Sequence, residues 1–146
     1  MSLWFMNAEN TINLKKISAD ESKLSEVIKL SIGYPTEDKI LEVIRSYHTT
    51  GNELIGAFWE GCLIGVIGLL QATEKITIRH ISVLREFQRQ GVGKLLLNDV
   101  KERYAEHKII AETDGESVGF YMKSGFSCHS FEDKYENMRY SCEFCS

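Results

Sequence analysis

The sequence predicts one α+β domain with a three-stranded antiparallel meander near its middle. Three observations support this fold class: period-two alternation marks short strands, helical spacing of apolar residues marks the helices, and turn residues separate the two. The 146 residues fit one compact domain, and 43% hydrophobic and 26% charged residues are ordinary for a globular protein. We therefore predict one domain over residues 1–146, with residues 1–10 as a flexible leader.

The first third of the chain predicts one strand and two helices. Residues 11–17 alternate apolar and polar side chains, as a half-buried strand does. Ser18 and Glu21 have the spacing of a capping box at the start of a helix. Residues 33–35 end that helix, and Thr36 is expected to cap a second one. The two apolar faces are expected to contain Leu24, Val27, Ile28 and Ile32, and Ile40, Val43, Ile44 and Tyr47.

The middle of the chain predicts the meander. Residues 53–59 and 62–70 are strand-like and flank Glu60 and Gly61, a pair suited to a tight hairpin turn. After a second turn, residues 76–83 form the third strand.

The last third returns to helical spacing and then to strands. Apolar residues at helical spacing over 92–104 predict a helix, and residues 108–113 predict a short buried strand. A short helix is expected over 117–124, ended by Gly125 in the left-handed conformation that suits glycine. Two closing strands are expected at 126–131 and 137–144.

Composition argues against two classes of partner. The net charge of −4 and the isoelectric point of about 5.6 disfavour a nucleic-acid-binding surface, which needs clustered Lys and Arg. No apolar stretch approaches the ~20 residues of a membrane span, and the first ten residues lack the pattern of a signal peptide. We expect a cytoplasmic protein that binds neither nucleic acid nor membrane.

The four cysteines are expected to be reduced thiols in that location. Cys142 and Cys145 supply two ligands where a structural zinc site needs four, and at this spacing on a strand they point to opposite faces. We therefore expect no metal site. The other two cysteines are Cys62 and Cys128.

A glycine-containing loop lies between the third meander strand and the next helix. A helix N-terminus offers unpaired N–H groups and partial positive charge, and glycines let phosphate oxygens approach the backbone. The sequence does not match a Walker A motif, because Gln88 and Leu95 occupy two of its required positions. It does not match a dinucleotide-binding fingerprint either, because of Leu96. The residues alone leave open a diphosphate cradle or a turn whose glycines only relieve crowding. The loop consists of Gln88, Arg89, Gln90, Gly91, Val92, Gly93 and Lys94.

Two motifs in order resemble the GNAT superfamily of N-acetyltransferases. Residues 81–83 and then 88–93 are similar to the family's strand and Gln/Arg-x-x-Gly-x-Gly/Ala loop, and residues 120–126 are similar to its aromatic-Tyr-x-Lys-x-Gly-Phe segment. Asp114 and Ser117 depart from the usual Asn and Ala. The resemblance covers residues 11–144. It implies three layers, in which a mixed, mostly antiparallel sheet is flanked by helices on both faces.

The resemblance also implies a cofactor and a reaction. Acetyl-CoA would be the donor, and its acetyl group would pass to a primary amine by direct attack, with no metal. The main chain at Ile81, Ser82 and Val83 would bind the pantetheine arm, residues 88–94 the pyrophosphate, and Asp114 and Ser117 other parts of the cofactor. Tyr121 would contact the cofactor and protonate the leaving thiolate.

The general base is less specified. His80 has a suitable unperturbed pKa, although a histidine inside a sheet is often a structural residue, and a water relay to Glu112 is an alternative. Strand alternation predicts Thr77, Arg79 and Ile81 on one face and His80 and Ser82 on the other.

The acceptor is expected near the first two helices. Tyr34 is a candidate for a pocket wall, and Glu37 or Asp38 for attracting a cation, although acidic residues are common in a first helical turn. The acceptor would be the amine of a small molecule or of a peptide. The family resemblance also implies that the closing strands form a homodimer contact. A non-catalytic acyl-CoA-binding or regulatory module and an interaction domain without a nucleotide site are the rival interpretations.

Overall fold

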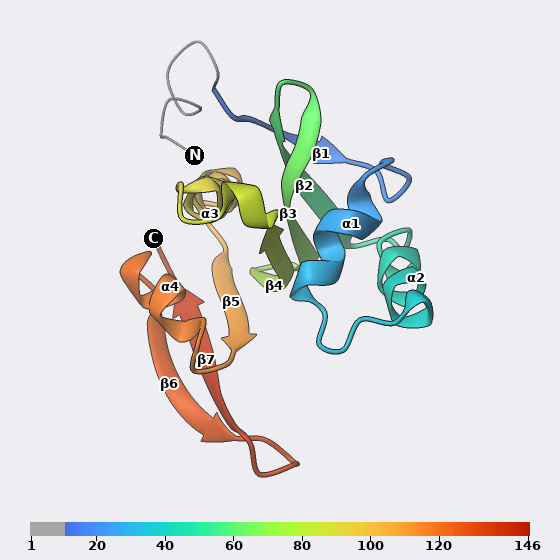
Figure 1. Ribbon diagram of the computed structural model, residues 1–146. Coiled ribbons are helices and arrows are strands. Elements are labelled where there is room, and N and C mark those ends of the chain that lie inside the picture. Colours follow the sequence, from blue (N-terminus) through green and yellow to red (C-terminus); the bar gives the residue numbers. More distant parts are fainter. Residues whose placement is uncertain (1–10) are drawn as a thin grey trace.

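The computed structural model describes residues 11–146, and the leader predicted over residues 1–10 lies outside them (Figure 1). Short strands and helices alternate along the chain. In chain order the elements are β1 (Asn13–Ile17), α1 (Leu24–Ile28), η3 (Lys29–Ser31), α2 (Glu37–Ser46), β2 (Asn52–Trp59), β3 (Cys62–Gln71), β4 (Lys75–Val83), η4 (Arg85–Phe87), α3 (Val92–Arg103), β5 (Lys108–Thr113), α4 (Val118–Lys123), β6 (Ser127–Glu132) and β7 (Met138–Phe144).

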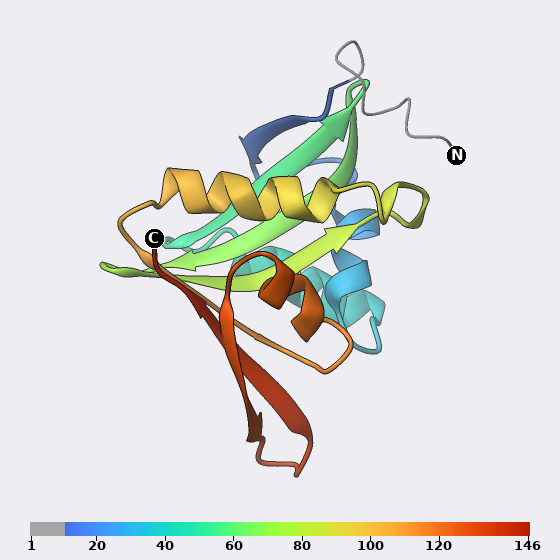
Figure 2. The same ribbon diagram turned by 90° about the vertical axis from the view of Figure 1, so that its left-hand side faces the viewer.

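One seven-stranded sheet organises the described residues, with strand order β1-β2-β3-β4-β5-β7-β6. The β4–β5 pair is parallel and the other neighbouring pairs are antiparallel. Helices α1 and α2 cover one face, while α3 and α4 cover the other (Figures 1 and 2). Each helical layer has its own apolar core against the sheet. The predicted fold class, a mixed and mostly antiparallel sheet between helices, is confirmed.

A β-bulge at Arg79 changes the direction of side chains along β4. His80 pairs with Gly68 of β3, but the next pair is Ile78 with Leu69, so Arg79 is an extra residue on β4. Ile78 packs with the core under α3, and so does Ile81 on the other side of the bulge. The Arg79 side chain instead bonds Ser46 at the end of α2. The prediction that Arg79 shares a face with Ile81 is therefore wrong, because the bulge interrupts the period of two.

The two parallel strands pair over only part of their length. The pairing runs from Lys75 with Lys108 to Ile78 with Ala111 and stops at the bulge. Beyond it β4 stays paired with β3 and β5 with β7, so the two strands diverge (Figure 2). The divergence leaves one edge of β4 without a strand neighbour from Arg79 to Val83.

The predicted capping box at Ser18 is wrong. Its hydroxyl accepts a hydrogen bond from the N–H of Asp20 at 2.9 Å, which forms a local turn, and α1 begins only at Leu24. That helix has five residues, so Ile32 lies beyond it. The predicted cap at Thr36 is confirmed, because its hydroxyl accepts from the N–H of Lys39 at 3.2 Å.

The turns follow the predicted chemistry. Glu60 and Gly61 have φ values of 50° and 79°, as the tight turn between β2 and β3 requires. Gly125 has φ 90° directly after Ser124, the C-cap of α4, in the left-handed conformation expected there.

The cysteine prediction fails for one pair. Cys128 and Cys142 lie opposite each other in β6 and β7 and form a disulfide, because their registered positions bring the two side chains together. Cys62 and Cys145 are free and exposed. Among residues 11–146, no group of three or more His, Cys, Asp or Glu side chains is arranged to hold a metal ion. Within the same range, the helices are too short or too polar to cross a membrane.

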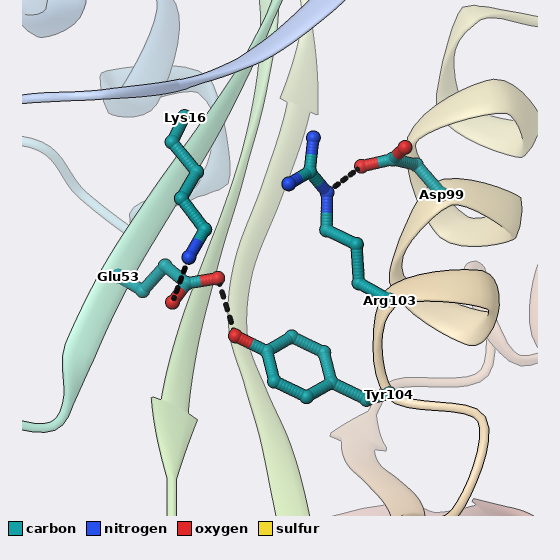
Figure 3. A network of polar contacts seen from close by, with 5 residues as sticks. All are labelled: Lys16, Glu53, Asp99, Arg103 and Tyr104. Carbon is teal, nitrogen blue, oxygen red and sulfur yellow. Dashed lines mark hydrogen bonds and ion pairs between the residues drawn. The ribbon is translucent and has the colours of Figure 1, made fainter.

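A polar network fastens the end of α3 to the sheet (Figure 3). The Tyr104 hydroxyl donates to Glu53 Oε1 on β2 at 2.6 Å, and Lys16 Nζ on β1 lies 3.5 Å from Glu53 Oε2. Within α3, Arg103 Nε donates to Asp99 Oδ2 at 2.5 Å. These contacts connect the C-terminal end of α3 with β1 and β2, and so help to fix the helix across the sheet.

Candidate active site

A cleft of about 1010 Å³ opens where β4 and β5 diverge. Its walls come from both faces of the sheet, since they include Leu30–Gly33 beside α1 and Phe120–Tyr121 of α4. The strand walls are residues 78–83 of β4 and residues 112–114 around the end of β5. The cleft thus reaches from one helical layer to the other through the opening in the sheet.

The edge of β4 exposes main-chain groups to this cleft. The Leu84 N–H donates to Ile64 O at 2.8 Å, which makes that opposed pair a hydrogen-bonded one. Hydrogen-bonded and non-hydrogen-bonded pairs alternate along an antiparallel ladder, so Ile81 and Val83 direct their N–H and C=O groups away from β3. Those groups face the diverging β5. An extended ligand therefore finds main-chain donors and acceptors along β4.

The N-terminus of α3 forms another wall. Gly91 is its N-cap, with φ 85°, and makes no side-chain capping bond. The first turn contains no acidic residue, and the first helical hydrogen bond is that of the Leu95 N–H to Gly91 O. A Cβ added to Gly91 would meet nothing within 4 Å, so the positive φ, rather than crowding, requires glycine. Uncapped N–H groups and basic neighbours fit a diphosphate.

The remaining loop residues divide between the cleft and the fold. Gln88, Arg89 and Lys94 line the cleft, and the Gln88 amide also donates to Val83 O at 2.8 Å, fixing the loop to the end of β4. Gln90 does not line the cleft, because its amide folds back to Glu86 O at 3.3 Å. The other predicted loop residues, Gly91, Val92 and Gly93, are cleft residues.

Tyr121 lies at the α4 side of the cleft. Its side chain is only 4% exposed, and burial raises its pKa to about 12. Its ring packs edge-on against Phe120 and Phe126, at centroid distances of 5.2 and 5.3 Å. The hydroxyl therefore keeps its proton throughout the physiological pH range and is a hydrogen-bond donor.

Asp114 and Ser117 also line the cleft, but they bond each other. Asp114 Oδ1 accepts from the Ser117 N–H at 2.9 Å, within the turn that precedes α4. This bond explains why an aspartate occupies position 114, and it engages one of the two carboxylate oxygens of Asp114.

His80 is coupled to a tyrosine that sequence reasoning placed only in a helix core. The Tyr47 hydroxyl lies 2.6 Å from His80 Nδ1. Burial, followed by the positive charge of Arg79, lowers the pKa of His80 to about 4, so its imidazole is neutral at pH 7. Gly68 makes room for the tyrosine, because a Cβ there would stand 2.5 Å from Tyr47 Cζ. A glycine inside a strand was the available sequence signal for this close approach.

Ser82 and the predicted acceptor residues have different surroundings. The Ser82 hydroxyl donates to Val27 O at 2.8 Å and so ties β4 to α1. Gly33 lines the cleft, but Tyr34 is 90% exposed and neither it nor Glu37 is a cleft residue. Tyr34 has φ 50°, and Glu37 begins α2 beside a separate, smaller pocket. Arg79 and Arg139 are cleft residues that sequence reasoning did not select.

Comparison with known proteins agrees with this geometry. Residues 35–140 match the family model described as "Acetyltransferase (GNAT) domain". A curated relative, an uncharacterised N-acetyltransferase in the lysA 3′ region of Bacillus methanolicus, is 27% identical over 97 residues, which cover 64% of this chain and 78% of the relative.

Solved structures share the fold. The aminoglycoside 6′-acetyltransferase type Ii superposes with a TM-score of 0.78 at 15% identity, covering 91% of this chain and 96% of that one. A GNAT family acetyltransferase from Elizabethkingia anophelis, solved with acetyl-CoA bound, gives 0.70 at 22% identity, covering 92% and 98%.

The fold and the cleft together define an acetyltransferase. The family match spans well over half of the chain, and the chain belongs to the GNAT acetyltransferase family. Its membership makes it an acetyl-CoA-dependent N-acetyltransferase.

Proposed function

We propose that the protein transfers an acetyl group from acetyl-CoA to a primary amine by direct attack within the cleft between β4 and β5. The observation that carries the proposal is the meeting of three features in one cleft. These are an uncapped helix N-terminus at Gly91, the unpaired edge of β4 at Ile81 and the hydroxyl of Tyr121, whose ring is buried. A donor with a diphosphate and an extended arm matches the first two.

Donor binding is assigned to this chain's own groups. N–H groups at the start of α3 would hold the pyrophosphate, with charge from Arg89 and Lys94. Ile81 would bond the pantetheine arm, whereas the Val83 carbonyl already accepts from Gln88. Of the predicted cofactor residues, Ser82 and Gln90 would act by holding β4 and the loop in place.

We propose Tyr121 as the proton donor toward the leaving sulfur. Burial raises its pKa to about 12, above the ~8.5 of an ordinary thiol, so complete proton transfer to the sulfur is uphill. The hydroxyl therefore acts first as a hydrogen-bond donor that stabilises negative charge developing on sulfur.

On the acceptor side, the amine must react as its free base. An alkylamine, whose conjugate acid has a pKa near ~10, is far more basic than His80, whose pKa is about 4. We propose that the proton lost after attack passes to the neutral His80 imidazole, with a water relay to Glu112 as the alternative. Replacing His80 with Gln distinguishes the two, since only the first predicts a large loss of turnover.

The decisive experiment measures release of CoA thiol with a broad panel of amines. Tyr121→Phe should lower kcat about 10²- to 10³-fold and leave acetyl-CoA affinity unchanged, because the ring packing remains. Tyr135→Phe, at a 71% exposed tyrosine, is the matched control. Binding of acetyl-CoA without turnover on any amine would favour the regulatory module. Absence of thermal stabilisation by saturating acetyl-CoA would exclude the donor site itself.

Three further assignments remain proposals. Residues 1–146 would act as one catalytic domain, and a homodimer through the closing strands is tested by analytical ultracentrifugation. A cytoplasmic location is tested by cell fractionation followed by detection of the protein in each fraction.

A further inference from the structure

The Tyr47 hydroxyl holds the His80 ring from outside the cleft. It lies 2.6 Å from His80 Nδ1, and the two rings meet edge-on with their centroids 5.7 Å apart. His80 lines the cleft between β4 and β5, whereas Tyr47 is the C-cap of α2 and does not line it. The tyrosine therefore acts on a bound reactant only through the histidine.

The second ring nitrogen of His80 is left for a ligand. Within residues 11–146, Nε2 bonds no protein group, and it is not sealed from solvent. Because the ring is rigid, a hydrogen bond at Nδ1 also determines the direction in which Nε2 points. Since His80 lines the cleft, Nε2 is the atom of this side chain that a reactant can reach.

Tyr47 is itself held in place by its surroundings. Its ring is 6% exposed and packs in the core under α1 and α2. Its hydroxyl fills the space above Gly68, the cross-strand partner of His80, and a Cβ on that glycine would collide with it. The Arg79 guanidinium covers the ring, with its central carbon 4.7 Å from the centroid, and donates to Asn52 of β2 at 3.0 Å. The hydroxyl is thus placed before any reactant arrives.

A phenol hydroxyl can bond the imidazole in each of its protonation states. Burial raises the pKa of Tyr47, and the charge of Arg79 only partly opposes this, so the hydroxyl keeps its proton at neutral pH. It can donate to a bare Nδ1, and after rotation its oxygen can accept from Nδ1–H. When the amine nitrogen gives its proton to Nε2, the ring already carries a proton on Nδ1, which the Tyr47 oxygen accepts as a hydrogen bond.

We propose that Tyr47 is a positioning residue for acetyl transfer, which acts through His80 by holding Nδ1 so that Nε2 faces the reactants. The proposal rests on the proposed function, because it concerns the route in which His80 takes the amine proton. Displacing a catalytic group by about 1 Å can lower a rate by ~10²-fold. Tyr47 should therefore contribute to kcat rather than to the binding of either substrate.

A double-mutant cycle tests whether the tyrosine acts through the histidine. Tyr47→Phe keeps the ring and removes only the hydroxyl. It should lower kcat at least about 10-fold and change KM for acetyl-CoA and for the amine less than about twofold. In a His80→Gln background the same substitution should change kcat less than about twofold, because no imidazole is left to position. Additive losses would overturn the proposal, since the hydroxyl would then act independently of His80.

Tyr104→Phe is the matched control for loss of a tyrosine hydroxyl. Tyr104 also makes a 2.6 Å hydrogen bond, to Glu53, but it does not line the cleft and does not contact His80. Its kcat should stay within about twofold of the wild type when the variants are assayed well below their melting temperatures. An equal loss of kcat in Tyr104→Phe and Tyr47→Phe would mean general destabilisation and would refute a positioning role.

A spectroscopic measurement makes the test independent of turnover. Nitrogen-15 NMR of the His80 ring, recorded on the full chain with acetyl-CoA bound, should show one dominant tautomer in the wild type. Tyr47→Phe should show an average of the two tautomers, because nothing then distinguishes the ring nitrogens. Identical ring spectra in the two proteins would contradict the proposal.

The outcomes separate this proposal from the proposed function. If His80→Gln and Tyr47→Phe both keep full turnover, acetyl transfer stands through the relay to Glu112 and the inference about Tyr47 is overturned. If acetyl-CoA binds but no amine turns over, the proposed function fails. The NMR comparison then decides the inference: a change of tautomer in Tyr47→Phe supports the positioning of His80, and no change refutes it.

Discussion

Replacing Gly68 with alanine should destabilise the protein by displacing Tyr47. A Cβ at this position would stand 2.5 Å from Tyr47 Cζ and 2.9 Å from its Cε1, and closer still to the hydroxyl. The ring is 6% exposed and packed in the core under α1 and α2, so it cannot move without disturbing its neighbours. Its displacement would break the 2.6 Å contact with His80 and the stacking under Arg79.

The magnitude follows from two contributions. Overpacking a core costs about 1–3 kcal/mol, and losing the Tyr47–His80 hydrogen bond adds about 1 kcal/mol. Gly68→Ala should therefore lower the free energy of unfolding by about 2–4 kcal/mol, or Tm by roughly 5–15 °C for a chain of this length. Urea unfolding followed by circular dichroism measures the first quantity, and differential scanning calorimetry the second.

A double-mutant cycle isolates the cause. In a Tyr47→Ala background the clash is absent, so Gly68→Ala should cost less than about 0.5 kcal/mol, and the coupling energy should be about 2 kcal/mol or more. Gly119→Ala is the control, because a Cβ there meets nothing within 4 Å and an alanine in α4 should stabilise by about 0.5 kcal/mol. A Gly68→Ala protein as stable as the wild type would refute the seating of Tyr47 over Gly68.

Three other predictions concern titration, the α3 network and the thiols. Folding lowers the pKa of His80 from 6.5 to about 4, so the unfolded chain binds more protons than the folded protein between these pH values. The free energy of unfolding should therefore decrease from pH 7 to pH 4, by about 1–2 kcal/mol after discounting for partial solvent exposure. His80→Gln should flatten this pH dependence when it is measured by urea titration. Tyr104→Phe should cost about 1–2 kcal/mol in urea unfolding, because it removes a hydrogen bond to the Glu53 carboxylate, whereas an unchanged midpoint would mean that the network in Figure 3 adds nothing. Protein unfolded without reductant should show two reactive thiols rather than four if Cys128 and Cys142 are joined, and reduction should lower stability by about 3 kcal/mol.

Sequence reasoning predicted the elements well because their signals are local. Thr36 caps α2 through a bond to a residue three positions away, and Gly61 and Gly125 adopt the positive φ that only their own turns require. The loop at Gly91 was identified for the same reason, since helix N-termini and glycines act on a few adjacent residues. The capping box at Ser18 failed where a competing local bond to Asp20 took the hydroxyl.

The parts of the site that were missed depend on contacts between distant segments. Arg79 was assigned to the wrong face because a bulge is a mismatch between two strands, and one strand's sequence does not contain it. Tyr47 and His80 are 33 positions apart, and their contact depends on how α2 crosses β4. The Cys128–Cys142 disulfide likewise requires the register of β6 with β7.

The bulge at Arg79 explains why the cleft opens where side-chain directions change along β4. The β4–β5 ladder stops at Ile78, immediately before it, so the strands diverge where side-chain directions also change. Ile76 and Ile78 before the bulge pack under α3, and so does Ile81 after it. In contrast, the side chains of Arg79 and His80 both contact groups of the α2 layer. One extra residue thus accompanies the opening of the cleft along β4 and turns two polar side chains toward the α2 layer. A regular strand would have placed Arg79 and His80 on opposite faces, and it would have continued the pairing with β5 that closes the cleft.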